Sequence, residues 1–252
     1  MIKGLYSAAS GMVGLERRHE VIANNIANAA TPGFRRHVPV HKGFNDILLH
    51  RMRHPFRLNA ERAPGGGQRL VETFTDVQNG NITGTEDPLN IALHGPGFIG
   101  IETPQGERFT RNGKLAIDAD GLLTTADGYQ VQAAAGGGID VSGGGIKIDD
   151  EGNVFSQGLF VAQIRVVEFE DPHMLTRVGF NLYEASEDAI ERSAPAANTR
   201  VLHKSIELSN VQVPAEMVQM MLGARAYEAN QRVITAIDDT MGRLINEVAM
   251  PV

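Results

Sequence analysis

The chain has 252 residues, of which 42% are hydrophobic and 21% charged, and its formal net charge is −7. This length supports a large core without disulfide or metal staples, and the absence of cysteine excludes disulfides, thiolate metal sites and cysteine nucleophiles. The acidic balance disfavours nucleic acid or an anionic membrane as a partner of the whole chain. We find no apolar run that predicts a membrane-inserted segment, and residues 1–7 lack the uninterrupted apolar stretch of a cleavable signal peptide.

The amino-terminal segment predicts one long helix. Its apolar residues recur at alternating steps of 3 and 4, interrupted once by His19, which is the heptad pattern of a helix that packs along one stripe. Pro32 and Gly33 end the pattern, because proline disfavours helical geometry at the residue before it. We expect a helix over roughly residues 5–29. Its stripe contains Leu5, Ala8, Met12, Leu15, Ile22 and Ile26.

The carboxy-terminal segment predicts a second helix with the same pattern. Pro214 suits a first helical turn, and Asn230 or Gln231 places one polar residue in the stripe. We expect this helix over roughly residues 214–248. Its stripe contains Met217, Met220, Ala224, Tyr227, Ile234, Ile237, Met241 and Leu244.

Residues 33–80 predict an extended basic arm. Between Arg35 and Arg69 basic residues exceed acidic ones by six, Phe34, Phe44 and Phe56 are interleaved with the cations, and three prolines break the segment. We interpret it as an arm that contacts solvent or an adjacent subunit. The alternatives are an anionic polymer such as cell-wall material and, less favoured by the acidic chain, single-stranded nucleic acid.

Residues 81–208 predict a mostly antiparallel β domain. Short apolar stretches at 89–93, 98–101, 114–117, 129–131 and 161–169 are separated by turn sequences at roughly ten-residue spacing. Asn112-Gly113 is the strongest single hairpin signal. The predicted class is therefore α+β: residues 1–32 and 209–252 form a coiled-coil-like helical domain, 33–80 the arm, and 81–208 the β domain.

Four motifs have part of the spacing of a functional site, but each favours a structural interpretation. Gly95 to Gly100 has the spacing of a dinucleotide fingerprint, but a strand follows it instead of a helix, which favours a bend between strands. Asp118 to Gly121 resembles the start of a calcium loop, but Tyr129 occupies the position of the bidentate Glu, which favours a hairpin turn. The pairs His37/His41 and His50/His54 have the spacing of two zinc ligands on one helical face, but Pro39 breaks the first pair and no HExxH acid accompanies the second, which favours solvated loop histidines. We expect no catalytic residue, cofactor or metal.

Each terminal helix must bury its apolar stripe, either against the other helix or against another chain. Contacts between chains that do not close on themselves generate helical filaments, so the pattern permits a rod as well as a dimer. Periodicity leaves both possibilities open.

Residues 21–36 closely resemble the amino-terminal signature of bacterial flagellar rod and hook proteins. Residues 95–98, 109–113 and 120–124 resemble the opening of that family's β domain, and residues 207–211, 216–218 and 225–230 resemble its carboxy-terminal motif. The matches follow the family's order over nearly the whole chain. The motif positions are Asn24, Asn25, Asn28, Thr31, Gly33, Phe34, Ser209, Asn210, Arg225, Tyr227 and Glu228.

The resemblance implies a non-enzymatic structural subunit of the flagellar basal-body rod that assembles with itself and with related axial proteins and transmits torque. It also implies export of the uncleaved chain by the flagellar type III apparatus and assembly in the periplasm. Chain length favours the rod over the hook subgroup, and residues 234–239 favour a proximal-rod over a distal-rod subunit. The rival interpretation is a secreted adhesin or cell-wall-binding β domain that dimerises through its helices.

Overall fold

The computed structural model describes residues 2–43, 68–179 and 181–248. The chain divides into two compact units. The helical unit comprises Met1–Ala27, His37–Phe74 and Gln212–Val252, and the β unit comprises Asn28–Arg36 and Thr75–Val211. The chain therefore passes from one unit to the other four times. Within the described ranges, no helix is both long and apolar enough to cross a membrane.

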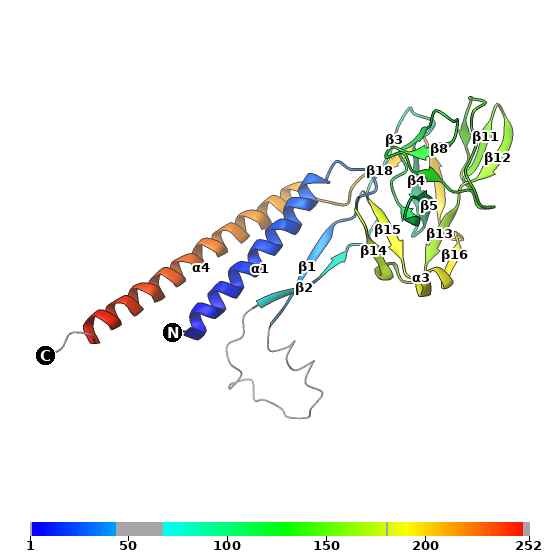
Figure 1. Ribbon diagram of the computed structural model, residues 1–252. Coiled ribbons are helices and arrows are strands. Elements are labelled where there is room, and N and C mark those ends of the chain that lie inside the picture. The colour runs from blue at the N-terminus through cyan, green and yellow to red at the C-terminus, as the bar shows by residue number, and fades with distance from the viewer. Residues whose placement is uncertain (1, 44–67, 180, 249–252) are drawn as a thin grey trace. The chain divides into compact units, whose positions relative to one another are not determined.

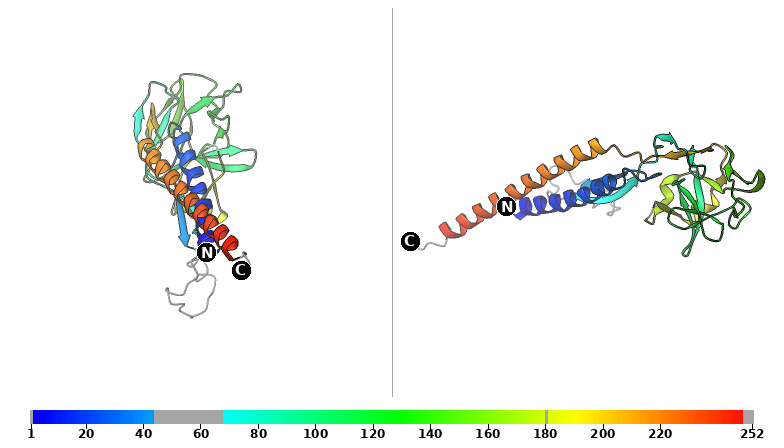
Figure 2. Two further views of the ribbon diagram at one scale, coloured as in Figure 1. Left: turned by 90° about the vertical axis from the view of Figure 1, so that its left-hand side faces the viewer. Right: turned by 90° about the horizontal axis from the view of Figure 1, so that it is seen from above.

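The helical unit contains α1 (Ile2–Ala27) and α4 (Val213–Val248), which confirms both predicted helices. The two helices lie side by side and run in opposite directions, as Figure 1 and the two views of Figure 2 show. Gly4 and Gly11 of α1 lie against α4, because a Cβ on Gly4 would lie 3.4 Å from Cδ1 of Ile237 and one on Gly11 would lie 3.4 Å from Nδ2 of Asn230, both within contact distance.

Two further contacts continue the pairing of α1 with α4. A Cβ on Gly223 would lie 2.6 Å from Nε2 of His19, and Nδ2 of Asn25 lies 3.5 Å from Oε2 of Glu216. The contact positions on α4 are spaced by seven residues, at Ile237, Asn230, Gly223 and Glu216. His19, which interrupts the apolar pattern, thus occupies the space that a glycine leaves on the opposite helix.

The helical unit also contains most of a two-stranded sheet, formed by β1 (His37–Gly43) and β2 (Gln68–Thr75). β1 contacts α1. Both strands fall within the predicted basic arm. Residues 44–67 of the arm, which include Phe44, Arg51, Arg53, Phe56, Arg57 and Arg62, together with His50 and His54, lie outside the described residues.

The β unit is built from short strands that pair antiparallel. Its largest sheet has the order β14-β15-β6-β5-β9-β8-β7, with β13 pairing with β5 and β16, and three smaller sheets are β10-β11-β12, β17-β4 and β18-β3. The strands are β3 (Ile82–Gly84), β4 (Ile91–His94), β5 (Phe98–Thr103), β6 (Gly106–Thr110), β7 (Leu115–Ile117), β8 (Leu123–Thr125), β9 (Gln130–Val131), β10 (Lys147–Ile148), β11 (Asn153–Ser156), β12 (Leu159–Gln163), β13 (Val166–Phe169), β14 (Leu175–Arg177), β15 (Leu182–Ala185), β16 (Ser193–Pro195), β17 (Arg200–His203) and β18 (Ser205–Glu207). A short helix, α3 (Glu187–Glu191), and a 3-10 turn, η2 (Pro172–Met174), connect some of them.

Two apolar clusters form the core of the β unit, and β5 contributes to both. Successive residues of a strand point to opposite faces, so Ile99 and Ile101 enter the larger aliphatic cluster while Phe98 enters a smaller aromatic one. In the aromatic cluster the ring of Phe98 meets those of Phe169 and Tyr183 edge to face, with centroids 5.8 and 5.4 Å apart. Because both faces of β5 are buried, its first residues are apolar in succession and do not alternate with polar ones.

The predicted α+β class and the antiparallel β domain are confirmed, with two local corrections. The hairpin expected at Asn112-Gly113 is wrong, because β6 pairs with β5 and β15, whereas β7 pairs with β8. Gly113 instead permits a close approach, since a Cβ there would lie 1.7 Å from the carbonyl oxygen of Ile91. The apolar stretch 161–169 is likewise two strands, β12 and β13. The predicted turns at 95–97 and 118–121 do connect β4 to β5 and β7 to β8.

Candidate functional site

α4 presents apolar side chains on two faces. The face toward α1 contains half-buried residues of the predicted stripe, namely Met220, Tyr227, Ile234, Ile237 and Met241. Other large apolar residues of α4 are exposed, and four of them are spaced so that they lie on one side of the helix; this uncovered face comprises Met217, Val218, Met221 and Leu222, with Leu222 at 53%. Val233, Leu244 and Ile245, the last at 67%, are exposed farther along the helix. A helix that is apolar on two faces has one face too many for a single partner helix.

The predicted interface residues are therefore divided between a packed and an uncovered surface. On α1, Ala8 and Ile22 are buried, while Leu5, Met12, Leu15 and Ile26 are half-buried. On α4, Met217, Ala224 and Leu244 of the predicted stripe are exposed. α1 also exposes Tyr6 and Val13, at 59% and 58%, which the prediction did not include.

Asn25 is the buried polar residue of the amino-terminal motif, with 1% of its surface exposed. Its Oδ1 accepts a hydrogen bond from the backbone N–H of His37 at 2.9 Å, and its Nδ2 donates to the carbonyl of the same residue at 2.9 Å. The side-chain amide thus pairs with the start of β1 as a neighbouring strand would. This pairing ties β1 to α1 inside the helical unit.

The next motif residues form a tight turn in the β unit. Gly33 has φ +68°, and its N–H donates to the carbonyl of Glu207 at 2.8 Å. A Cβ on Gly33 would lie 2.5 Å from the backbone of Arg111, so the turn requires glycine for both its conformation and its contact. Phe34 is buried, and the guanidinium of Arg177 lies 4.3 Å from its ring centroid.

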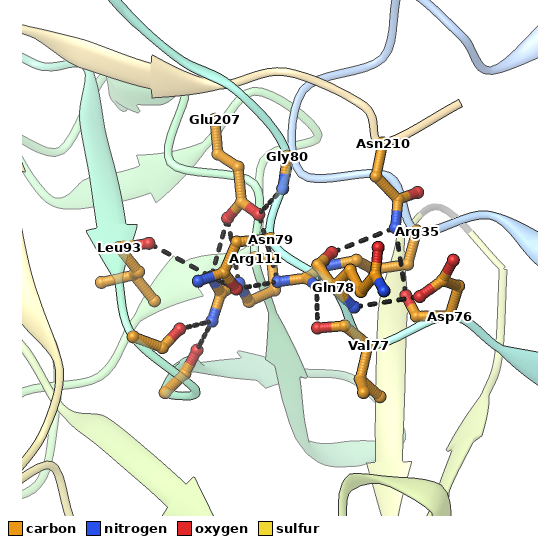
Figure 3. A network of polar contacts seen from close by, with 12 residues as sticks. Arg35, Asp76, Val77, Gln78, Asn79, Gly80, Leu93, Arg111, Glu207 and Asn210 are labelled. Carbon is orange, nitrogen blue, oxygen red and sulfur yellow. Dashed lines mark hydrogen bonds and ion pairs between the residues drawn. The ribbon is translucent and has the colours of Figure 1, made fainter. Parts of the chain in front are cut away.

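Asn210, from the carboxy-terminal motif, joins two other segments of the β unit, and Figure 3 shows its contacts with one of them, at Asp76 and Gln78. Its Oδ1 accepts from the backbone N–H of Arg36 at 2.7 Å, and its Nδ2 donates to the carbonyls of Asp76 and Gln78 at 3.2 and 3.0 Å. Of the remaining motif residues, Asn28 accepts from the backbone N–H of Thr31 and Ser209 accepts from that of Val211. Asn24, Arg225 and Glu228 lie at exposed helical positions.

A buried charge cluster lies beside Asn210 and contains Arg35, Arg111 and Glu207 (Figure 3). The side chains of the three residues are 5%, 0% and 1% exposed. Oε1 of Glu207 lies 3.1 Å from Nη2 of Arg35 and accepts from the N–H of Gly80 at 2.9 Å. Its Oε2 lies 2.9 Å from Nη2 of Arg111 and accepts from Nε of the same residue at 3.0 Å.

Arg35 also holds the segment that follows β2. It donates to the carbonyls of Val77 and Gln78 and, at 2.9 Å, to Oδ1 of Asn79. Burial lowers the pKa of Arg35, the nearby charge of Arg111 lowers it further, and Glu207 opposes both effects. The cluster therefore cross-links residues 33–36, 77–80 and 207–210, the segments of the β unit that lie next to its connections with the helical unit.

Sequence reasoning missed this cluster. It treated Arg35 as part of an arm facing solvent or another subunit, whereas its side chain is buried against the β unit. Arg111 and Glu207 are 96 residues apart, so no local pattern predicts that they meet. Both residues do lie within stretches that resemble the rod family, at 109–113 and 207–211, and this position indicated that they have a role in the fold. Across the described ranges, no group of three or more His, Asp or Glu side chains could hold a metal ion.

Comparison with known proteins gives matches to the amino-terminal, central and carboxy-terminal parts of the chain. Residues 5–35 match the model of the flagella basal body rod protein family, residues 92–163 that of the flagellar hook protein FlgE/F/G D1 domain, and residues 203–247 that of the flagellar basal body rod FlgEFG protein C-terminal region. The fold and these matches define a structural protein of the flagellar axis.

Similar proteins extend over the full length. The chain is 31% identical to the flagellar basal-body rod protein FlgG of Buchnera aphidicola subsp. Baizongia pistaciae, over 97% of this chain and 99% of the relative. It is 30% identical to FlgG of Bacillus subtilis, over 98% and 99%, and 27% identical to the rod protein FlgF of Caulobacter vibrioides, over 91% of each chain. The chain belongs to the flagellar basal-body rod protein family.

Proposed function

We propose that this rod protein polymerises with copies of itself and with related axial proteins through its terminal helices, and that the resulting rod transmits torque. The uncovered apolar face of α4, from Met217 to Leu222, carries this proposal. Exposed apolar side chains gathered on one face of a helix are typical of a protein–protein contact. A subunit that already pairs α1 with α4 retains this second face for a neighbour.

The packing of α1 on α4 supports a coiled-coil-like domain as the assembling unit. The contact positions Ile237, Asn230, Gly223 and Glu216 are seven residues apart, as a heptad seam requires. The domains we propose are residues 1–32 and 209–252 for axial packing, 33–80 for the arm and 81–208 for the β domain. Assembly in the periplasm after export by the flagellar type III apparatus, and the proximal position in the rod that residues 234–239 favour, complete the proposal.

A charge substitution on the uncovered face tests the proposal. Leu222→Glu places a carboxylate where 53% of the leucine is exposed, so it leaves the helix pair intact but opposes burial against a neighbour. Gln231→Glu, at another exposed position of α4, is the matched control. We expect both variants to have the circular dichroism of the parent chain, and only Leu222→Glu to lose polymerisation in light scattering and motility in cells.

Two results would count against the proposal. Normal polymerisation of Leu222→Glu would mean that the uncovered face is not the contact. Equal loss in both variants would mean that any added negative charge on α4 blocks assembly, and that the apolar face has no specific role.

A further inference from the structure

A cavity of about 340 Å³ lies in the β unit beside the charge cluster. Val77, Pro96 and Phe98 provide apolar walls, and Arg35 and Arg111 line the same cavity. This volume lies within the range of small-ligand sites, and a mostly apolar wall with a few converging polar groups is their usual composition.

The cluster beside this cavity lacks one negative charge. Two guanidiniums, both nearly inaccessible to solvent, share the single carboxylate of Glu207. Asp76 acts on Arg35 only through its charge at a distance, since no ion pair between them is found in the described part of the chain. A buried charge without a partner is unfavourable, so an additional anion near Arg35 would stabilise the cluster.

Two buried donors on residues that line the cavity have no acceptor among the described residues. They are Nε of Arg35 and the hydroxyl of Tyr183, a residue that is 2% exposed. Arg111, by contrast, uses all its nitrogens, on Glu207, on Asn79 and on backbone carbonyls. Arg35 and Tyr183 are thus the groups that remain for a ligand.

The electrostatic surroundings of the Tyr183 hydroxyl agree with this assignment. Burial raises its pKa, which keeps it protonated and able to donate. The positive charges of Arg177, Arg35 and Arg111 act on the pKa of the same hydroxyl in the opposite direction, and the smaller contribution of the Glu207 charge opposes them. The hydroxyl therefore lies in a region of positive potential, where an anionic acceptor is favoured over a neutral one.

We infer that this cavity binds a carboxylate carried on an apolar group, with its oxygens accepting from Arg35 and Tyr183 and its apolar part lying against Phe98 and Pro96. The carboxylate supplies the missing negative charge. A small rearrangement of the cavity wall lets its oxygens accept hydrogen bonds from both buried donors. A free carboxylic acid and an acidic side chain of a neighbouring copy of this chain share this chemistry.

Benzoate is the probe, with benzamide as its neutral counterpart of the same shape. We expect isothermal titration of the dispersed full-length chain to show saturable binding of benzoate, at least about tenfold tighter than that of benzamide, because hydrogen bonds to a charged acceptor are the stronger ones. Tyr183→Phe should weaken benzoate binding about fivefold or more, without lowering the unfolding midpoint of the free chain, since it removes an unsatisfied hydroxyl. Tyr129→Phe, which lies outside this cavity, should bind benzoate as the parent does.

The inference is overturned if benzoate does not bind, if benzamide binds as tightly, or if Tyr183→Phe retains full affinity. If the inference holds, titration of the assembled rod distinguishes a free carboxylic acid from an acidic side chain of a neighbouring copy as the natural ligand. Benzoate binding by both dispersed and assembled chains indicates a free acid, and binding by the dispersed chain alone indicates a neighbour's side chain, so either result supports the site. Because the first titration uses dispersed chains, its outcome is independent of the proposed assembly.

Discussion

Replacing Glu207 with glutamine is the sharpest test of the charge cluster. The substitution keeps the size of the side chain but removes the carboxylate that pairs with both Arg35 and Arg111. Both guanidiniums then remain buried without a negative charge. The NH2 group of the introduced glutamine is a donor and faces guanidinium N–H groups that are also donors. Breaking a buried ion pair by removing one partner costs about 3–5 kcal/mol, against a total stability of about 5–15 kcal/mol for an ordinary domain.

Glu184→Gln is the matched control for this prediction. Glu184 pairs with Arg108 at 3.1 Å, but its side chain is 46% exposed, so we expect a change of about 0–1 kcal/mol. The same chemical substitution should thus give very different losses at the two positions, because only one of the pairs is shielded from water.

Equilibrium urea unfolding of the full chain, followed by circular dichroism, measures both losses. Hydrogen exchange adds a local readout, since the Gly80 N–H donates to Oε1 of Glu207 and should exchange faster in Glu207→Gln. A loss below about 1 kcal/mol, or one equal to that of Glu184→Gln, would refute the view that this buried cluster holds its three segments together.

Three further predictions concern single contacts. Gly223→Ala should destabilise the helix pair by about 1–3 kcal/mol in thermal unfolding, because its Cβ would lie 2.6 Å from His19. In a chain that already carries His19→Ala, the same substitution should instead raise the stability, because alanine forms helices better than glycine. Gly33→Ala should lower the urea midpoint by the equivalent of more than about 2 kcal/mol, because a Cβ at φ +68° would lie 2.5 Å from main-chain atoms; an unchanged midpoint would contradict the turn described. Burial raises the pKa of Glu168, but hydrogen bonds from Thr199 and nearby groups outweigh it and hold that pKa below 4.5. The stability lost in Glu168→Gln at pH 7 should therefore shrink as the pH falls from 4.5 through the lowered pKa, whereas a constant difference down to strongly acidic pH would exclude this linkage.

The features that the sequence determined are those encoded by neighbouring residues. Alternating steps of 3 and 4 predicted both terminal helices, because a helix brings residues so spaced onto one face. The turn at 118–121 was predicted because Asp and Gly favour turn conformations in their own right. Motif resemblance led to the rod family for the same reason, since each motif is a continuous stretch of chain.

What only the tertiary structure decided depends on residues that are distant along the chain. Asn112-Gly113 has the local sequence of a hairpin, but the approach of Ile91 gives its glycine a different role. From the sequence, Arg35 is expected to be a solvated cation. In the structure it is buried beside Glu207 and Arg111, which come from other segments of the chain. The division of α4 into packed and uncovered faces likewise required the position of α1. Periodicity specifies which residues share a face of a helix, but the partner of that face is set by contacts between segments that no local pattern relates.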